Sequence, residues 1–223
     1  MLNIAIDGPA GAGKSTVADE VARRLGILHL DTGAMYRAVG LAMLDAGIDL
    51  NDEQAVTHCC RSGGAIVDVR YQNGAQVTLV NGRDVTGLIR TQQVGDAASC
   101  ISRYAAVRRM LVARQQELAR KQHMLVDGRD IGTVVLPDAP VKVYLTASAE
   151  ERARSRLLQL QEKGQEADFE AVLAEVNARD AQDMNREVDP LRQAEDAVVV
   201  DSTNLSLEET VQAVLRLAEA ANG

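Results

Sequence analysis

The sequence predicts an α/β protein with a doubly wound sheet of five parallel strands. Five short apolar runs have the length of buried strands and lie near residues 2–6, 27–30, 124–127, 141–145 and 197–200. Segments with helical apolar spacing separate them, and alternating strands and helices are typical of a parallel sheet covered by helices. Residues 63–122 interrupt this alternation with strand-like runs. We therefore expect a small inserted subdomain there.

The first strand leads directly into a glycine-rich stretch, Gly8-Pro9-Ala10-Gly11-Ala12-Gly13-Lys14-Ser15, which Thr16 and a helix to Leu25 follow. Strand, glycine loop and helix in this order are typical of a P-loop, which binds nucleotide phosphates. Glycines leave backbone amides open to an anion, and the helix N-terminus adds partial positive charge. Lys14 supplies a charge for the β- and γ-phosphates, and the Ser15 hydroxyl is a candidate Mg²⁺ ligand.

Composition argues against several other classes of function. The chain has 223 residues and a formal net charge of −8, with no Trp, one Phe and four Tyr. A protein that grips nucleic acid needs positive charge or aromatic rings for stacking. No apolar stretch has the length of a membrane span, and the N-terminus enters the first strand without a signal peptide. We expect a cytoplasmic protein that binds neither nucleic acid nor membranes. The three cysteines lack metal-site spacing and are expected to be reduced.

The second strand is followed by a candidate substrate corner. Asp31 and Thr32 lie where this strand ends and a helix of residues 34–46 begins, with Gly47 ending the helix. In an open parallel sheet this edge binds ligands, although an N-cap is also part of the role of Asp31. Tyr36 and Arg37 on the first helical turns are more than a cap needs, so we expect a substrate role here.

The inserted subdomain is predicted to hold a three-stranded antiparallel meander. Its strand-like runs cover residues 65–71, 76–80 and 83–85, and Asn73-Gly74 and Asn81-Gly82 separate them. Asn-Gly between alternating apolar residues is a strong hairpin signal. Two helices, near 91–102 and 105–122, are expected to follow the meander.

Further candidate side chains follow the third strand. Arg129 and Asp130 lie just past it, at the same sheet edge as the P-loop. Asp127 ends the strand itself. It either orients Mg²⁺ through water or simply caps the turn, and the sequence does not decide between the two.

Two helices near 149–163 and 168–186 are predicted to form a helical hairpin around the Gly164-Gln165 turn. Arg152 and Arg156 lie four residues apart, with Arg154 off that stripe. Arg179, Asp183 and Arg186 have the spacing of a single helix face. A salt-bridged solvent face would have the same spacing. The planar guanidinium suits phosphate, however, so the hairpin is a candidate lid. A last strand and a C-terminal helix, opened by the Ser206–Glu209 capping-box pattern, complete the chain.

Taken together, these motifs resemble the bacterial cytidylate kinase family, nucleoside monophosphate kinases with a long insertion. The blocks that carry the resemblance are residues 6–9, Asp31-Thr32-Gly33-Ala34-Met35-Tyr36-Arg37, Ile89-Arg90-Thr91-Gln92, residues 127–135, residues 158–164, and Arg179-Asp180 through Asn185-Arg186. The resemblance implies transfer of the ATP γ-phosphoryl group to CMP or dCMP, with Mg²⁺. It further implies one kinase domain with a core (1–62, 123–148 and 187–223), an acceptor-binding insert (63–122) and a lid (149–186).

The resemblance also implies roles for individual residues. Those that read cytosine would be Ser99, Arg108 and Asp130; those that hold the sugar, Arg179 and Asp183; those that hold the monophosphate, Arg37, Arg129 and Arg186. Pocket walls would come from Thr32 and Tyr36, and lid arginines from Arg152, Arg154 and Arg156. Catalysis would rest on Lys14, Arg129, Arg152, Arg156 and Arg186. Arg109 directly follows Arg108, and the flanking block favours Arg108. The family often has Gly where Ser15 stands, and the serine strengthens the Mg²⁺ assignment.

Two other functions stay open at this point. One is another P-loop kinase of small molecules, acting on UMP or a non-nucleotide alcohol. The other is a regulatory GTPase, although the chain has no Asn-Lys-x-Asp motif for reading guanine. The kinase chemistry needs no general base, because a monophosphate oxygen is already a nucleophile. We expect a monomer.

Overall fold

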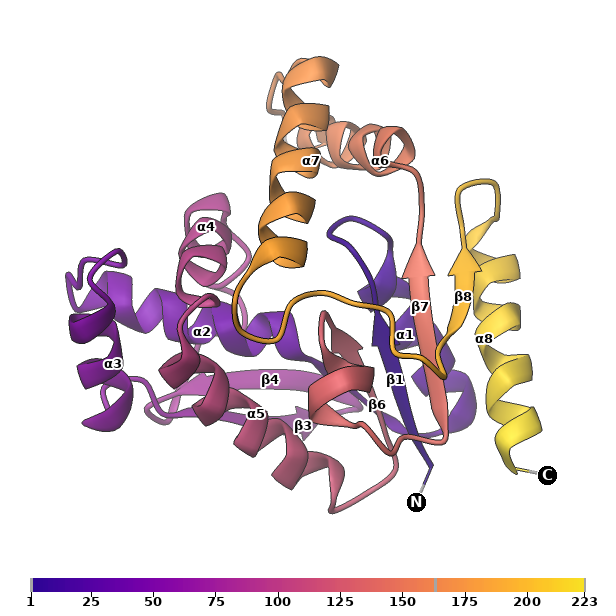
Figure 1. The fold of residues 1–223 in the computed structure, drawn as a ribbon, viewed down its shortest axis with the longest axis horizontal. Coiled ribbons are helices and arrows are strands. Elements are labelled where there is room, and N and C mark those ends of the chain that lie inside the picture. The colour runs from indigo at the N-terminus through magenta and orange to yellow at the C-terminus, as the bar shows by residue number, and fades with distance from the viewer. Residues whose placement is uncertain (1, 163, 223) are drawn as a thin grey trace. The chain divides into compact units, whose positions relative to one another are not determined.

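The computed structural model describes residues 2–162 and 164–222 (Figure 1). Met1, Lys163 and Gly223 lie outside the described residues. Lys163 is the predicted end of the helix near 149–163, and Met1 and Gly223 are the first and last residues of the predicted core. The described chain divides into two compact units. One is residues 28–124; the other combines residues 2–27 with residues 125–162 and 164–222.

The main sheet has five strands in the order β2-β6-β1-β7-β8, which confirms the predicted α/β class. β1 (Asn3–Asp7) pairs in parallel with β7 (Val141–Thr146), and β7 pairs in parallel with β8 (Val198–Asp201). β2 (Leu28–Asp31) and β6 (Met124–Gly128) complete the sheet. Each strand lies within one residue of its predicted position. Asp7 ends β1 and Asp127 is the last but one residue of β6, so both lie at the carboxyl ends of their strands, where parallel sheets bind ligands.

The second unit has its core between these strands and two helices. α1 (Lys14–Leu25) and α8 (Leu207–Asn222) contribute Val17, Val21 and Val211 to a cluster with Ile6 and Val143. α1 ends at Gly26, whose left-handed backbone (φ 65°) is the usual glycine C-cap. α8 begins with the predicted capping box, in which the Glu209 amide donates to the Ser206 hydroxyl and the Ser206 amide donates to the Glu209 carboxylate.

The predicted helical hairpin is present. α6 (Ala149–Glu162) and α7 (Phe169–Asn185) pack against each other, as Figure 1 shows. Asp168 caps α7 by accepting a hydrogen bond from the Ala171 amide. α7 ends one residue before Arg186, whose backbone is extended (φ −64°, ψ 144°). The expectation that Arg186 shares a helix face with Arg179 and Asp183 is therefore wrong, because the helical spacing does not reach it.

One element was not expected from the sequence. Residues Ile131–Val135 form a short π-helix, η1, directly after β6 and Arg129-Asp130. A π-turn inserts an extra residue into helical backbone and is frequently found at functional sites. A segment of 5 residues is too short for an apolar repeat to predict a helix there.

The unit of residues 28–124 holds α2 (Thr32–Asp45), α3 (Glu53–Arg61), α4 (Gln92–Ile101) and α5 (Ala105–Ala119). Its antiparallel sheet is the predicted meander, with β3 (Val67–Gln72), β4 (Ala75–Val80) and β5 (Arg83–Asp84). Positive φ at Asn73, Gly74, Asn81 and Gly82 fits the tight hairpin turns predicted there.

The remaining compositional expectations concern thiols and membranes. Cys59, Cys60 and Cys100 are free thiols, and Cys59 is buried. In the part of the chain that the structure describes, every helix is too short or too polar to cross a bilayer.

Candidate active site

Two glycines, Gly8 and Gly13, shape the P-loop. A Cβ at Gly8 would lie 1.9 Å from the Leu145 carbonyl oxygen, so the loop runs against β7 only because this side chain is missing. Gly13 occupies the N-cap of α1 with a left-handed backbone (φ 78°). α1 therefore begins at Lys14, and its first amides face the anion-binding end of the loop.

Lys14 is held inside the loop that it serves. Its ammonium donates a 2.7 Å hydrogen bond to the Pro9 carbonyl, and the side chain is buried. Burial first, and then the charge of Arg129, lower the pKa of Lys14 from its ordinary value of 10.5 to about 7, although Asp127, Asp183 and Asp7 oppose the shift. A polyphosphate bound beside this amine would favour its charged form.

Ser15 and Asp127 meet directly. The Ser15 hydroxyl donates a 2.9 Å hydrogen bond to Oδ2 of Asp127, which is buried at the end of β6. A hydroxyl and a carboxylate oxygen are the ligands that Mg²⁺ prefers, either directly or through water. The donor set therefore fits the metal, and the side chain of Asp127 contacts the P-loop serine. No three His, Cys, Asp or Glu side chains gather as a metal cluster within residues 2–162 and 164–222.

Five charged residues, which lie past β6, on α7 and directly after α7, form three ion pairs. Arg129 Nε lies 2.8 Å from Oδ2 of Asp183, and Arg186 Nη2 lies 3.6 Å from Oδ1 of Asp130. Arg179 Nε lies 3.6 Å from the same Asp183 oxygen as Arg129. Burial alone would raise the pKa of Asp183, but the charges of Arg129 and Arg179 outweigh it and the pKa is lowered. Residues far apart in sequence thus form one charged cluster in this unit.

Arg152 lies against the P-loop. Its Nη1 donates to the Ala10 carbonyl at 3.0 Å, and its Nε donates to the Ala147 carbonyl at 3.0 Å. Both Nη atoms also contact the carboxylate of Asp180 on α7, at 3.0 and 2.6 Å. Arg152 is therefore the inward arginine of the hairpin, and Asp180 is a partner that helical spacing did not single out.

The other two arginines of α6 lie differently. Arg154 is exposed, pairs with Glu151 at 3.2 Å and stacks over the Phe169 ring at 6.0 Å from the centroid. Arg156 is half-buried, one turn after Arg152. Among the predicted lid residues, Arg152 is thus tied to the P-loop by a hydrogen bond.

In the unit of residues 28–124, the predicted corner forms around the start of α2. Asp31 caps this helix by accepting from the Ala34 amide at 2.9 Å. Arg37 donates to the Ile89 and Thr91 carbonyls at 3.1 and 3.2 Å. Thr32 at the first position of α2 is buried. The cap and the arginine were predicted, and the loop that receives Arg37 belongs to a block that carries the family resemblance.

Tyr36 and Arg108 come together in the same unit. The Arg108 guanidinium carbon lies 5.7 Å from the Tyr36 ring centroid, and its Nη1 donates to the Ser102 carbonyl at 3.3 Å. Arg108 is 1% exposed, whereas Arg109 is exposed. Ser99 on α4 is buried as well. Of the two neighbouring arginines, Arg108 is the one that points inward.

Sequence reasoning missed two carboxylates. Asp7 is 4% exposed and accepts hydrogen bonds from the amides of Ile131 and Gly132, at 2.6 and 2.7 Å. Its position at the end of a strand, beside the P-loop, was a signal of the same kind as that of Asp127. Asp180 lies one residue after Arg179, and no pattern distinguishes it from a solvent-facing helix residue.

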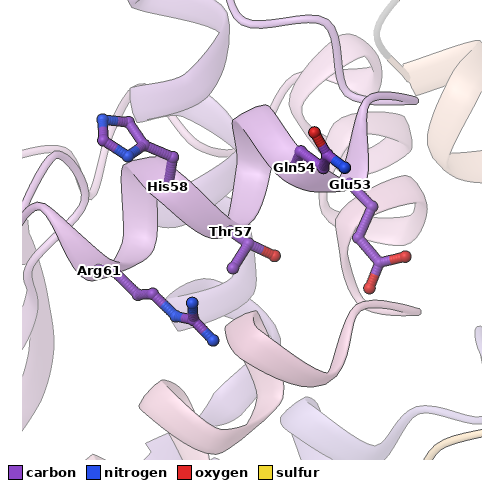
Figure 2. Close-up of a pocket in the computed structure, with 5 residues that line it drawn as sticks. All are labelled: Glu53, Gln54, Thr57, His58 and Arg61. Atoms are coloured by element: carbon purple, nitrogen blue, oxygen red, sulfur yellow. The ribbon is translucent and has the colours of Figure 1, made fainter.

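A separate hollow of about 350 Å³ lies along α3 (Figure 2). It is lined by Glu53, Gln54, Thr57, His58 and Arg61. These side chains come from one helix, and none of them belongs to the predicted site. The P-loop and its partners are therefore the stronger candidate for chemistry.

Comparisons with known proteins identify the family of the chain. A family model described as cytidylate kinase matches residues 4–220. The chain is 50% identical over 216 residues to a cytidylate kinase of Caldicellulosiruptor saccharolyticus, covering 97% of this chain and 95% of that protein. It is 48% identical over 220 residues to a cytidylate kinase of Shouchella clausii, covering 98% and 96%.

A solved structure supports the fold alone. The shikimate kinase of Bacteroides thetaiotaomicron superposes with a TM-score of 0.50 at 13% identity, covering 98% of both chains. The family is shown by the sequence matches, which extend over nearly the whole chain and include the P-loop. The chain therefore belongs to the cytidylate kinase family.

Proposed function

We propose that this protein transfers the γ-phosphoryl group of ATP to CMP or dCMP and releases ADP with CDP or dCDP. Such an enzyme acts in pyrimidine nucleotide metabolism. The observation that carries the proposal is the P-loop: Lys14 and Ser15 open α1, and Ser15 contacts Asp127. Family membership supports the choice of acceptor.

We assign the donor to residues 8–16. Backbone amides of the loop and of the α1 N-terminus would bind the phosphate oxygens, and Lys14 would pair with the β- and γ-phosphates. Ser15 would hold Mg²⁺, with Asp127 orienting it through water. When bound, the metal neutralises charge on the phosphates. The side chains themselves hold ATP in place for attack.

We assign acceptor contacts to residues of each unit separately. From residues 28–124, Ser99 and Arg108 would read cytosine, Arg37 would bind the monophosphate, and Thr32 and Tyr36 would line the pocket. From the second unit, Asp130 would accept from the cytosine amine, Arg179 and Asp183 would hold the sugar, and Arg129 and Arg186 would bind the monophosphate. A carboxylate suits the exocyclic amine and a guanidinium suits the ring carbonyl. The residue set therefore supplies the chemical groups that suit the binding of cytidine monophosphate.

Catalysis follows from position and charge. A monophosphate oxygen attacks the γ-phosphorus, the bond to the β-phosphate oxygen breaks, and ADP leaves. Lys14, Arg129, Arg152, Arg156 and Arg186 would stabilise the charge on the transferring group, and no base is needed. We assign residues 149–186, which include Arg154, to a lid that excludes water. We assign residues 63–122 to the acceptor-binding insert. The remaining residues, 1–62, 123–148 and 187–223, would form the core of a single kinase domain. We expect a cytoplasmic monomer.

The test is an ADP-release assay with ATP and single acceptors: CMP, dCMP, UMP, AMP, GMP and shikimate. We expect CMP or dCMP to give the highest kcat/KM, and Lys14→Ala to lower kcat at least about a hundredfold. A preference for UMP or shikimate would assign the protein to another small-molecule kinase activity. Tight guanine binding with no acceptor turnover would favour a nucleotide switch.

A further inference from the structure

The N-terminus of η1 is capped from a distant strand. Asp7, the last residue of β1, gives one carboxylate oxygen to each of two successive amides. Oδ1 accepts from Ile131 at 2.6 Å and Oδ2 accepts from Gly132 at 2.7 Å. Asp7 is 4% exposed, so these bonds are shielded from water. A buried carboxylate thus fixes the first turn of the π-helix.

The residue that would ordinarily make this cap is Asp130. It occupies the N-cap position of η1, yet within the described residues its side chain makes no cap hydrogen bond. Its carboxylate instead lies 3.6 Å from Arg186. Because Asp7 receives the amides, the Asp130 side chain is directed elsewhere.

Packing around the contact is tight. A Cβ at Gly132 would lie 3.2 Å from Oδ2 of Asp7 and 3.2 Å from Cδ of Lys142. Position 132 therefore admits glycine with little room for a methyl group. The Asp7 carboxylate and the Gly132 backbone that it binds therefore fit together in a single arrangement.

We propose that Asp7 is a positioning residue for the acceptor-reading segment Arg129-Asp130. It acts through the Ile131 and Gly132 amides and ties this segment to the residue that enters the P-loop at Gly8. The proposal rests on the proposed function, in which Asp130 reads cytosine. Base selectivity should therefore depend on a residue that does not touch the base.

The test is Asp7→Asn, assayed with ATP against CMP and UMP. An asparagine keeps one acceptor oxygen and turns an NH₂ group toward the second amide, so one of the two bonds is lost. We expect kcat/KM for CMP to fall about tenfold and the CMP-to-UMP selectivity ratio to fall at least about fivefold, with KM for ATP changed less than about threefold. Amide exchange at Ile131 and Gly132 should accelerate in the variant.

The matched control is Asp52→Asn at the N-cap of α3. There a single oxygen, Oδ1, accepts from both Gln54 and Ala55, so asparagine retains both bonds. The control should leave both kcat/KM values and their ratio unchanged. A general effect of replacing a capping aspartate would appear in both variants.

Gly132→Ala provides a second approach should Asp7→Asn fail to fold. Its methyl group pushes on the Asp7 carboxylate, and the selectivity ratio should fall in the same direction. An unchanged CMP-to-UMP ratio in a folded Asp7→Asn or Gly132→Ala protein would overturn the proposal, whatever the overall rate. A wild-type protein without CMP turnover would refute the proposed function instead, and the two failures are thus distinguishable.

Discussion

The Ser15 hydroxyl donates a 2.9 Å hydrogen bond to Oδ2 of Asp127, which joins the start of α1 to the end of β6. Because both groups suit Mg²⁺, Ser15→Ala and Asp127→Asn should each raise the Mg²⁺ concentration for half-maximal rate about tenfold. The measurement is a Mg²⁺ titration of kcat at saturating ATP. Ser62→Ala removes a serine hydroxyl that bonds only the Cys59 carbonyl among the recorded contacts and should change nothing. Equal Mg²⁺ requirements in all four proteins would contradict this assignment.

ATP binding should take up a proton at pH 8. Burial first, and then the charge of Arg129, lower the pKa of Lys14 to about 7 in the ligand-free protein, so the amine is mostly neutral at pH 8. Phosphates raise this pKa, and affinity therefore falls as pH rises through 7. Calorimetry in two buffers of different ionisation enthalpy should show uptake of up to about one proton.

Lys14→Arg is the control for that experiment, because a guanidinium stays charged at every pH used. The variant should bind ATP with little or no proton uptake. Equal uptake by both proteins would assign the proton to another group.

Arg152 and Asp180 should be strongly coupled in stability. Their side chains are 6% and 14% exposed, and removing either one leaves the other charge in a shielded place. Asp180→Ala should lower the free energy of unfolding by about 3 kcal/mol, and a double-mutant cycle with Arg152→Ala should give a coupling of about 2 kcal/mol. Urea unfolding measures both quantities.

The same helix offers a matched pair for comparison. Arg154 and Glu151 are 62% and 41% exposed, and their cycle should give at most about 0.5 kcal/mol. Similar coupling in the two cycles would show that the inward pair does not hold the hairpin.

Asp130→Ala should weaken discrimination between bases. Loss of a charged hydrogen-bond acceptor predicts a fall of about tenfold or more in the CMP-to-UMP ratio of kcat/KM, with little change in ATP affinity. Steady-state kinetics with both acceptors measures the ratio. Unchanged selectivity would remove Asp130 from the base-reading set.

Local patterns predicted most of the fold. The five strands lie within one residue of their expected positions, because buried apolar runs between turn residues are a strong local signal. The Asn-Gly turns and the meander were predicted from equally local signals. Arg186 shows the limit of such patterns. Its spacing predicted that the helix includes Arg186, but α7 ends at Asn185.

The contacts that organise the site could not be predicted from the sequence, for a physical reason. Asp7 meets Ile131 and Gly132 across 124 and 125 residues, and Arg152 meets Asp180 through the packing of two helices. Such pairings depend on strand order and helix register, which single-chain periodicity does not encode. The first turn of η1 makes the same long-range hydrogen bonds to Asp7.

The central claim is that CMP is the acceptor, and a competition experiment tests it most directly. ATP with Mg²⁺ is supplied with equal concentrations of CMP, UMP and AMP, and the diphosphates are separated by ion-exchange chromatography at low conversion. Product ratios then equal the ratios of kcat/KM. The account predicts that CDP forms in large excess over UDP, and that ADP equals the sum of CDP and UDP, with no surplus ADP from phosphorylation of AMP. Equal or greater formation of UDP, or no CDP at all, would contradict it.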